Sequence, residues 1–279
     1  MHNYHDVASQ FPISIGWNPR NNERHGAFSD KVFLLPYLDR ASEYRLTNVD
    51  QRPWDSGGWF GSENIQAHSG RLPVFNCPTQ PYEVSGGASN FTYSINVGVV
   101  DSRHNSNGSD RHNGFSCFVG AGGNSSSPVN AASVSDGLSN TAAYSEFVIE
   151  HDANDSGPRS HTVHHWAAGN TPAQIRADCL RKTQKGGRYG MRGRSRAWSF
   201  VGVGSTYSHT MAPNDKPCHS RSGAGDWEGT SVMSASSMHT GGVHVLMGDG
   251  AVRFVNDSVD YNTWLAVGTR NGAETPGEF

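Results

Sequence analysis

The chain has 279 residues, enough for one large hydrophobic core or for two smaller domains, and we expect residues 1–279 to form a single domain. Its net charge of -3 excludes a generally basic nucleic-acid-binding protein, and no apolar run approaches the roughly 18 residues that span a bilayer. Only 35% of the residues are hydrophobic and 33 are glycine, which predicts long polar loops on a β-rich scaffold.

Helical spacing is visible twice near the N-terminus. Residues 1–9 place Met1, Tyr4 and Val7 on one helical face. Residues 29–45 repeat apolar side chains every three residues and contain Pro36, which can begin a second helical segment. We therefore predict a short N-terminal helix and then a broken amphipathic helix that packs on a sheet.

Two long segments carry little regular pattern. Residues 46–90 are rich in turn residues and include Trp54 and Trp59, whose rings could stack on sugars or form a small core of their own. Residues 101–130 consist largely of Asn, Ser, Gly and Asp without periodicity, which predicts a surface loop insertion.

The middle of the chain predicts two strands and a helix. Residues 91–100 and 141–150 alternate in the manner of strands, and the second has one mixed face. Thr171 and Gln174 form a capping box around Pro172 at the first helical position, so a helix is expected to begin there.

A basic segment follows at residues 181–197, which we predict to be a second surface loop insertion. It contains the arginines of a candidate interface: Arg188, Arg192, Arg194 and Arg196. An acidic loop of a neighbouring copy or an anionic polysaccharide would complement this charge, and a solvated loop is the alternative. The acidity of the whole chain argues against nucleic acid as a partner.

The C-terminal region predicts a strand, a turn, a strand and a helix. Apolar residues alternate on both sides of Asp249-Gly250, a dipeptide that favours positive φ angles and therefore a β-hairpin. Asp260 can cap a helix that Gly268 would end in the left-handed conformation. Extended chain separates His239 from Asp249 by roughly 30 Å, so we interpret His239 as a packing residue at a strand entrance and Asp249 as the turn residue.

The spacing and order of several segments resemble one protein family. His239 and Asp249-Gly250 are spaced as in the prepilin-type H-X9-DG proteins, the DUF1559 family, and Gly268-Thr-Arg-Asn-Gly-Ala-Glu274 resembles the ending of its members. Other segments resemble the same family: His2-Asn-Tyr-His-Asp6, Leu34-Leu-Pro-Tyr-Leu38, Cys77-Pro78, Ser135-Asp-Gly-Leu-Ser-Asn-Thr141 with Glu146, and Pro213-Asn214.

The resemblance implies a pseudopilin-like protein, normally with a leader peptide and a long apolar helix upstream of the first of these segments. That helix is absent from the sequence given. We therefore expect an α+β fold in which a pilin-like antiparallel β-sheet packs on a truncated N-terminal helix. Large loop insertions and a C-terminal β-hairpin with a short helix complete this expectation.

The cysteines are widely spaced and contain no Cys-x-x-Cys pair, which argues against a zinc ribbon or a thioredoxin-like site. An even number in a loop-rich chain suits disulfides. We favour Cys77 with Cys117 and Cys179 with Cys218, since each pair closes a local loop, and buried thiols are the alternative.

Loops that are dense in Asp and Asn make calcium the most plausible bound ion, although no cofactor is certain. Asp152, Asn154 and Ser156 match the first half of a calcium loop, but Val163 stands where an EF-hand has its glutamate. A second oxygen-rich group comprises Asp136, Asn140 and Glu146, which a turn with its own side-chain hydrogen bonds explains equally well.

N-glycosylation sequons begin at Asn90, Asn107, Asn124, Asn154 and Asn256. The common catalytic motifs, such as Gly-x-Ser-x-Gly and His-Glu-x-x-His, are absent. We therefore expect a non-enzymatic, extracellular or cell-surface structural protein that is pseudopilin-like and assembles with copies of itself. A surface module that binds glycan or calcium is the first alternative, and a hydrolase with an unrecognised site is the second.

Overall fold

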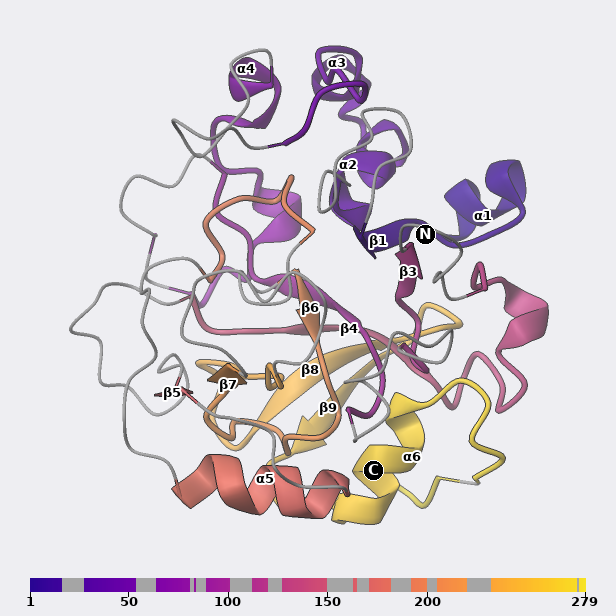
Figure 1. Ribbon diagram of the computed structural model, residues 1–279, viewed down its shortest axis with the longest axis vertical. Helices are drawn as coiled ribbons and strands as arrows, with labels where there is room; N and C mark the ends of the chain where they lie inside the picture. Colours follow the sequence, from indigo (N-terminus) through magenta and orange to yellow (C-terminus); the bar gives the residue numbers. More distant parts are fainter. Residues whose placement is uncertain are drawn as a thin grey trace.

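A computed structural model of the chain describes residues 1–16, 28–53, 64–80, 83, 89–100, 112–119, 127–149, 163–164, 171–181, 192–199, 205–219, 232–274 and 276–279. A five-stranded sheet lies at the centre, with helices and long connections around it (Figure 1). The strand order is β6 (Thr206–Tyr207), β2 (Tyr93–Asn96), β4 (Ala142–Glu146), β8 (Gly242–Met247) and β9 (Val252–Asn256). The fold is therefore α+β, as expected.

The pairs β2 with β4, β4 with β8 and β8 with β9 are antiparallel, whereas β6 is parallel to β2. The expected antiparallel sheet is thus confirmed for these four strands and wrong for β6. The long connection between β2 and β6 allows the parallel pairing, because a parallel pair needs a crossover instead of a tight turn.

The predicted hairpin is present as β8 and β9, which pair in register from Gly242 opposite Asn256 to Leu246 opposite Val252. Gly250 has a φ angle of 95°, and the Asp249 carboxylate accepts a hydrogen bond of 2.9 Å from the backbone N–H of Ala251. Asp249 and Gly250 therefore form the turn, as their sequence predicts.

Helix α6 (Tyr261–Gly268) also begins where predicted, because the Asp260 side chain accepts a hydrogen bond from the backbone N–H of Thr263. Its end differs from the prediction. Gly268 belongs to the helix, and Thr269 follows in an extended conformation with a φ angle of -99°. A Cβ atom at position 268 would lie 2.5 Å from the His209 side chain, so glycine is needed here for close packing.

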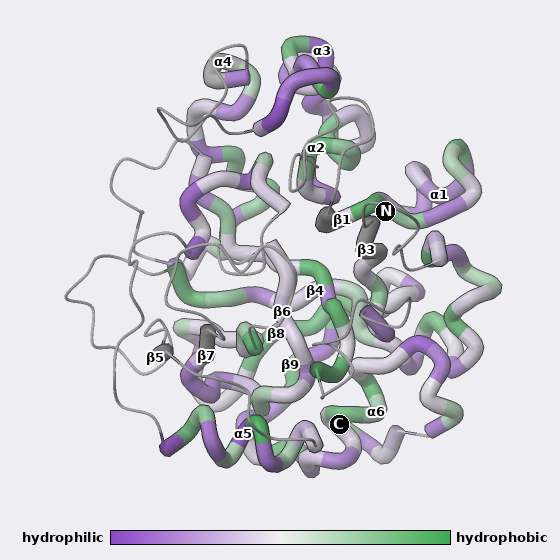
Figure 2. Tube along the Cα trace, viewed as in Figure 1, coloured by the Kyte–Doolittle hydropathy of each residue, from purple (hydrophilic) through white to green (hydrophobic). Residues whose placement is uncertain are grey.

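One face of the sheet packs against α6 and forms a hydrophobic core. Figure 2 shows hydrophobic residues recurring along β8 and α6, the elements that enclose this core. Its fully buried members include Val243, Val245, Met247, Val255 and Trp264. The alternation along β8 and β9 therefore sets which side chains are buried on this face.

The opposite face of the sheet is covered in part by the N-terminal elements α1 (His2–Ala8), α2 (Asp30–Leu34) and η1 (Leu35–Tyr37). The short helix and the broken helix predicted for this region are both present. A β-bulge between the pairs Ala142 with Met247 and Tyr144 with Leu246 turns Tyr144 toward the N-terminal elements. Glu146, two residues farther along β4, lies on the same face.

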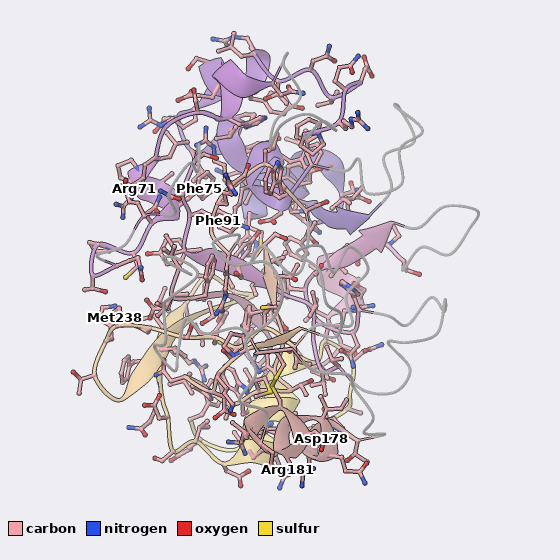
Figure 3. The ribbon with its side chains drawn as sticks, turned by 60° about the vertical axis from the view of Figure 1, so that its left-hand side comes forward. Arg71, Phe75, Phe91, Asp178, Arg181 and Met238 are labelled. Atoms are coloured by element: carbon pink, nitrogen blue, oxygen red, sulfur yellow. A yellow bond between two sulfur atoms is a disulfide. The ribbon has the colours of Figure 1, made fainter. Side chains whose placement is uncertain are left out.

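The other elements are helix α5 (Pro172–Arg181) and several short segments: β1 (Ile13–Gly16), α3 (Ala41–Arg45), α4 (Ile65–His68), η2 (Pro73–Phe75), β3 (Cys117–Val119), η5 (Ala131–Ser133), β5 (Val163–His164) and β7 (Cys218–His219). The capping box of Thr171 and Gln174 starts α5, as predicted. A disulfide joins Cys179 of α5 to Cys218 of β7, close to Asp178 in Figure 3. This pairing is confirmed.

The two predicted surface insertions require correction in their described parts. Phe115 and Val129, within residues 101–130, are fully buried in the core under the N-terminal elements. In the second segment, Arg192, Arg196 and Ala197 are also buried. Single buried side chains hold both segments against the rest of the fold. Such side chains do not recur at a regular spacing, so the sequence pattern does not reveal them.

Across the described part of the chain, the helices are all too short or too polar to cross a lipid bilayer.

Candidate functional site

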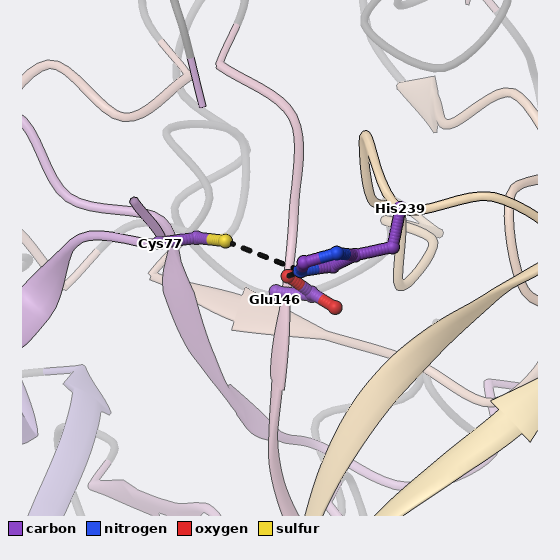
Figure 4. Close-up of side chains that lie close together, drawn as sticks. All are labelled: Cys77, Glu146 and His239. Atoms are coloured by element: carbon purple, nitrogen blue, oxygen red, sulfur yellow. Dashed lines mark hydrogen bonds and ion pairs between the residues drawn. The ribbon is translucent and has the colours of Figure 1, made fainter. Parts of the chain in front are cut away.

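Three side chains from distant parts of the sequence meet at the second face of the sheet. Cys77 follows η2, Glu146 is the last residue of β4, and His239 precedes β8 (Figure 4). The sheet order explains the meeting, because β4 lies between β2 and β8, and the backbone N–H of Cys77 donates a hydrogen bond of 2.6 Å to Thr92 Oγ1, just before β2. We call Cys77, Glu146 and His239 the Cys-Glu-His cluster.

The same nitrogen of His239 faces both other members of the cluster. Its Nε2 atom lies 3.5 Å from Cys77 Sγ and 3.5 Å from Glu146 Oε2. Thr79 Oγ1 lies 3.4 Å from this nitrogen and 3.0 Å from the sulfur. The sulfur, nitrogen and carboxylate oxygen of the cluster all lie within 4.8 Å of one another.

The Glu146 side chain is only 3% exposed, and contacts with His244 fix its orientation. Its Oε1 atom accepts a hydrogen bond of 2.7 Å from the backbone N–H of His244 and lies 3.1 Å from His244 Nδ1. The other oxygen, Oε2, is thereby directed toward His239. A buried carboxylate requires such partners, because desolvation of an unpaired charge is strongly unfavourable.

Cys77 is a free, buried thiol, so the predicted disulfide between Cys77 and Cys117 is wrong. Its sulfur is directed to His239 and Thr79, whereas Cys117 belongs to β3, which pairs with β1. Closeness in sequence favours a local loop but does not fix the direction of a side chain. Burial raises the pKa of the Cys77 thiol, and the hydrogen bond with Thr79 opposes this rise.

The geometry decides between two chemistries for the Cys-Glu-His cluster. In a nucleophilic triad, the histidine uses one ring nitrogen for the nucleophile and the other for the carboxylate. Here Nε2 of His239 faces both Cys77 and Glu146. A reactive cysteine also has a lowered pKa, whereas the pKa of Cys77 is raised. Three ligand atoms that converge on one point are instead typical of a metal site.

The cluster lines a cavity of about 500 Å³ whose other walls are mostly apolar. Leu34 and Leu38 line it from the N-terminal elements, and Leu246 and Val252 from the hairpin. This volume lies in the range of small-molecule pockets, which are typically apolar with a few fixed polar groups.

A buried polar network lies at the same cavity. The Tyr144 hydroxyl donates to Asp30 Oδ2 at 2.7 Å, and Lys31 Nζ donates to Asp30 Oδ1 at 3.3 Å. Lys31 Nζ also lies 4.8 Å from the ring centroid of Phe91. Burial lowers the pKa of Lys31 and raises the pKa of Tyr144 well above its usual value. The network therefore fixes α2 to β4 under the cavity.

The predicted calcium ligands do not form a site in the described residues. The Asp136 carboxylate accepts hydrogen bonds from the backbone N–H groups of Gly272 and Ala273, and Asn140 Nδ2 donates to the Asp136 carbonyl. Strand β4 then carries Glu146 away to the Cys-Glu-His cluster. Asp136 and Asn140 thus belong to a turn with its own hydrogen bonds, Glu146 belongs to the Cys-Glu-His cluster, and calcium binding by the chain stays a prediction.

The other calcium candidates, Asp152, Asn154 and Ser156, lie outside the described residues, as do Trp54 and Trp59.

The predicted basic interface is contradicted at two of its arginines. Arg192 Nη2 donates to the Ser234 carbonyl at 2.8 Å, and Arg196 donates to the carbonyls of Gly70 and Ala67 at 2.7 and 3.0 Å. Both side chains are about 1% exposed, and burial lowers the pKa of Arg196 to about 10. These guanidinium groups bind backbone carbonyls inside the fold because several N–H donors can satisfy several carbonyls at once. Arg194 is partly buried and Arg188 lies outside the described residues.

The sequons have different outcomes. Asn90 and Thr92 are buried at 5% and 0% exposure, so a glycan on Asn90 would not fit the folded chain and this prediction is wrong. Asn256 is exposed at the end of β9, and its Oδ1 atom accepts a hydrogen bond from the backbone N–H of Ser258. The sequons at Asn107, Asn124 and Asn154 lie outside the described residues.

The two motif residues His239 and Asp249 lie beyond opposite ends of β8. His239 lies before β8 and joins the Cys-Glu-His cluster, while Asp249 lies in the turn beyond the other end of the same strand. The prediction that Asp249 is a turn residue is confirmed. His239, predicted to be a packing residue, also contacts Cys77 and Glu146 through its Nε2 atom. Cys77, Glu146 and His239 belong to three separate segments of the sequence, and only the strand order brings them together.

Comparison with known proteins supports one assignment. Neither the curated proteins nor the solved structures contain a match to this chain. The family described as "Protein of unknown function (DUF1559)" matches residues 1–262, which include all three members of the Cys-Glu-His cluster. The chain therefore belongs to the DUF1559 family.

Proposed function

We propose that this protein is a non-enzymatic, extracellular, pseudopilin-like subunit that assembles with copies of itself into a cell-surface filament or appendage. Membership of the DUF1559 family and the loop-rich composition are compatible with this role. The observation that carries the proposal is the outer edge of β9, the last strand of the sheet.

The backbone of β9 offers pairing groups along this edge. The backbone N–H of Met247 donates to the Ala251 carbonyl, and the backbone N–H of Asp257 donates to the Gly241 carbonyl. These two bonds identify which residues of β9 form hydrogen-bonded pairs with β8. Because bonded and non-bonded pairs alternate in an antiparallel ladder, the backbone N–H and C=O groups of Val252 and Phe254 point away from β8. Such an edge is a template for a strand of another chain.

The side chains on the same edge are unusual for a protected edge strand. Val252 is 63% exposed and Phe254 is 46% exposed. Protected edges commonly carry charges or proline at such positions. We therefore propose that a second copy adds a strand to β9 and buries these two side chains, in place of the basic interface predicted from Arg192 and Arg196.

The experiment tests assembly of the purified protein by size-exclusion chromatography and negative-stain microscopy. The Val252→Lys and Phe254→Lys variants are expected to lose the assembled species, because a charge at this edge prevents strand addition. Leu46→Lys is the matched control, since Leu46 is 51% exposed and lies outside the sheet. Assembly that persists in both edge variants would remove β9 as the interface.

An extracellular location is supported by the Cys179–Cys218 disulfide, because disulfides persist in oxidising compartments. Fractionation of the producing cells, with the intact mass of the recovered protein, would test it. Recovery of the protein only from the cytosol in reduced form would contradict this part of the proposal.

A thiol hydrolase is the second candidate, favoured by the distance of 3.5 Å between Cys77 Sγ and His239 Nε2. The shared nitrogen and the raised pKa of Cys77 weigh against it. Turnover assays with esters, peptides and glycosides separate the two functions. We expect no turnover that depends on Cys77.

A further inference from the structure

We propose that Cys77 Sγ, His239 Nε2 and Glu146 Oε2 bind a zinc ion at the wall of the cavity. The inference does not depend on self-assembly. It rests on the convergence of three different ligand types from Cys77, Glu146 and His239. Thiolate, imidazole and carboxylate are the groups that bind zinc in proteins.

The two ligand separations that involve His239 suit this ion. Zinc binds sulfur at about 2.3 Å and nitrogen or oxygen at about 2.0 to 2.2 Å, so tetrahedral ligands lie roughly 3.3 to 3.6 Å apart. His239 Nε2 lies 3.5 Å from Cys77 Sγ and 3.5 Å from Glu146 Oε2. The nitrogen is therefore placed at ligand separation from both partners without any change of backbone.

The ligands are also oriented by neighbours. The backbone N–H and Nδ1 of His244 hold Oε1 of Glu146, which leaves Oε2 toward His239. Carboxylate ligands of metal sites are commonly fixed by such outer contacts. Thr79 Oγ1 is 3.0 Å from Cys77 Sγ and can donate a hydrogen bond to the thiolate that zinc binding creates.

The cluster gives three protein ligands, and all three line the cavity. A three-ligand zinc site keeps a fourth position for water or another small ligand. This position would be supplied from the cavity, whose apolar walls include Leu34 and Leu246. Its accessibility distinguishes the proposed site from a closed structural zinc site with four protein ligands.

The first test uses the whole folded chain. Zinc chloride is titrated by calorimetry in anaerobic buffer without reductant, so that the Cys179–Cys218 disulfide remains intact. We expect saturable binding of one zinc ion per chain. Replacement of zinc by cobalt should produce a thiolate-to-cobalt charge-transfer band, which reports the sulfur ligand directly.

The second test identifies the ligands. Cys77→Ser should abolish the charge-transfer band, and His239→Gln and Glu146→Gln should weaken zinc binding by 10-fold or more. His244→Gln should keep the band and weaken binding on the order of 10-fold, since His244 only orients Glu146. His2→Gln is the matched control, because this exposed histidine of α1 lies outside the cluster.

A third measurement does not require any variant to fold. Iodoacetamide at alkaline pH should label Cys77 slowly in the metal-free protein, because this thiol is buried and its pKa is raised, and zinc should slow the labelling at least 10-fold further. The proposal is overturned if the folded wild-type chain shows no saturable zinc heat and no cobalt band. A rate of Cys77 labelling that is the same with and without zinc would overturn it as well.

Discussion

Glu146 accepts two contacts from His244 on one carboxylate oxygen, from the backbone N–H at 2.7 Å and from Nδ1 at 3.1 Å. The pairing ties β4 to β8 beyond their ladder and determines the direction of the second oxygen. It is the contact on which the geometry of the Cys-Glu-His cluster depends.

Removal of this carboxylate should destabilise the fold. Glu146→Ala leaves the part-buried backbone N–H of His244 without its acceptor, and we expect a loss of about 1 to 2 kcal/mol in the free energy of unfolding. Glu146→Gln keeps an acceptor oxygen and should lose less. Urea denaturation of the metal-free variants measures both values, and equal losses would contradict the role of Oε1.

Stability should fall in acid because of two buried histidines. Burial lowers the pKa values of His68 and His209 to about 3, and the neighbouring Arg196 contributes for His68. Below their ordinary pKa of 6.5, the unfolded chain binds protons that the folded chain does not. Their contribution is fully present above this pH and is lost as the pH falls toward 3.

The expected slope is up to about 1.4 kcal/mol per pH unit for each histidine. Urea denaturation at a series of pH values measures it, and His68→Gln should remove the share of one histidine. An unchanged slope in this variant would show that His68 takes up a proton while folded.

Loss of the disulfide should have a large effect. Cys179 and Cys218 are separated by 39 residues, and opening a loop of this length lowers the free energy of unfolding by about 3 to 4 kcal/mol. Thermal or urea denaturation with and without reductant measures the loss. The double variant Cys179→Ala/Cys218→Ala is the control, because reductant should not destabilise it further.

Gly268 tests the packing of α6. The Gly268→Ala variant places a methyl group 2.5 Å from the Cβ and Cγ atoms of His209, and we expect a loss of about 1 to 3 kcal/mol. Gly241→Ala is a comparison, because nothing lies within 4 Å of the position that its new methyl group would take and only its φ angle of 81° opposes alanine. A Gly268→Ala variant as stable as the wild type would show that His209 can move away.

The elements that were predicted well depend on neighbouring residues. The Asp249-Gly250 turn, the Asp260 cap and the capping box that begins at Thr171 each involve a few consecutive residues. Their hydrogen bonds are determined locally, so the sequence alone is sufficient.

The Cys-Glu-His cluster could not be predicted in this way. Cys77 and His239 are separated by 162 positions, and their meeting depends on the order of β2, β4 and β8 in the sheet. The buried arginines were missed for a related reason. Runs of charge are usually solvated, and no local pattern shows that Arg192 and Arg196 bind distant backbone carbonyls.

Because Arg192 and Arg196 are buried, chemical modification of their guanidinium groups can report on opening of the fold. A dicarbonyl reagent that is selective for guanidinium groups should spare both side chains while the Ser234, Gly70 and Ala67 carbonyls hold them. Their modification therefore requires these arginine-to-carbonyl hydrogen bonds to open. The rate of modification distinguishes local opening of the chain from cooperative unfolding.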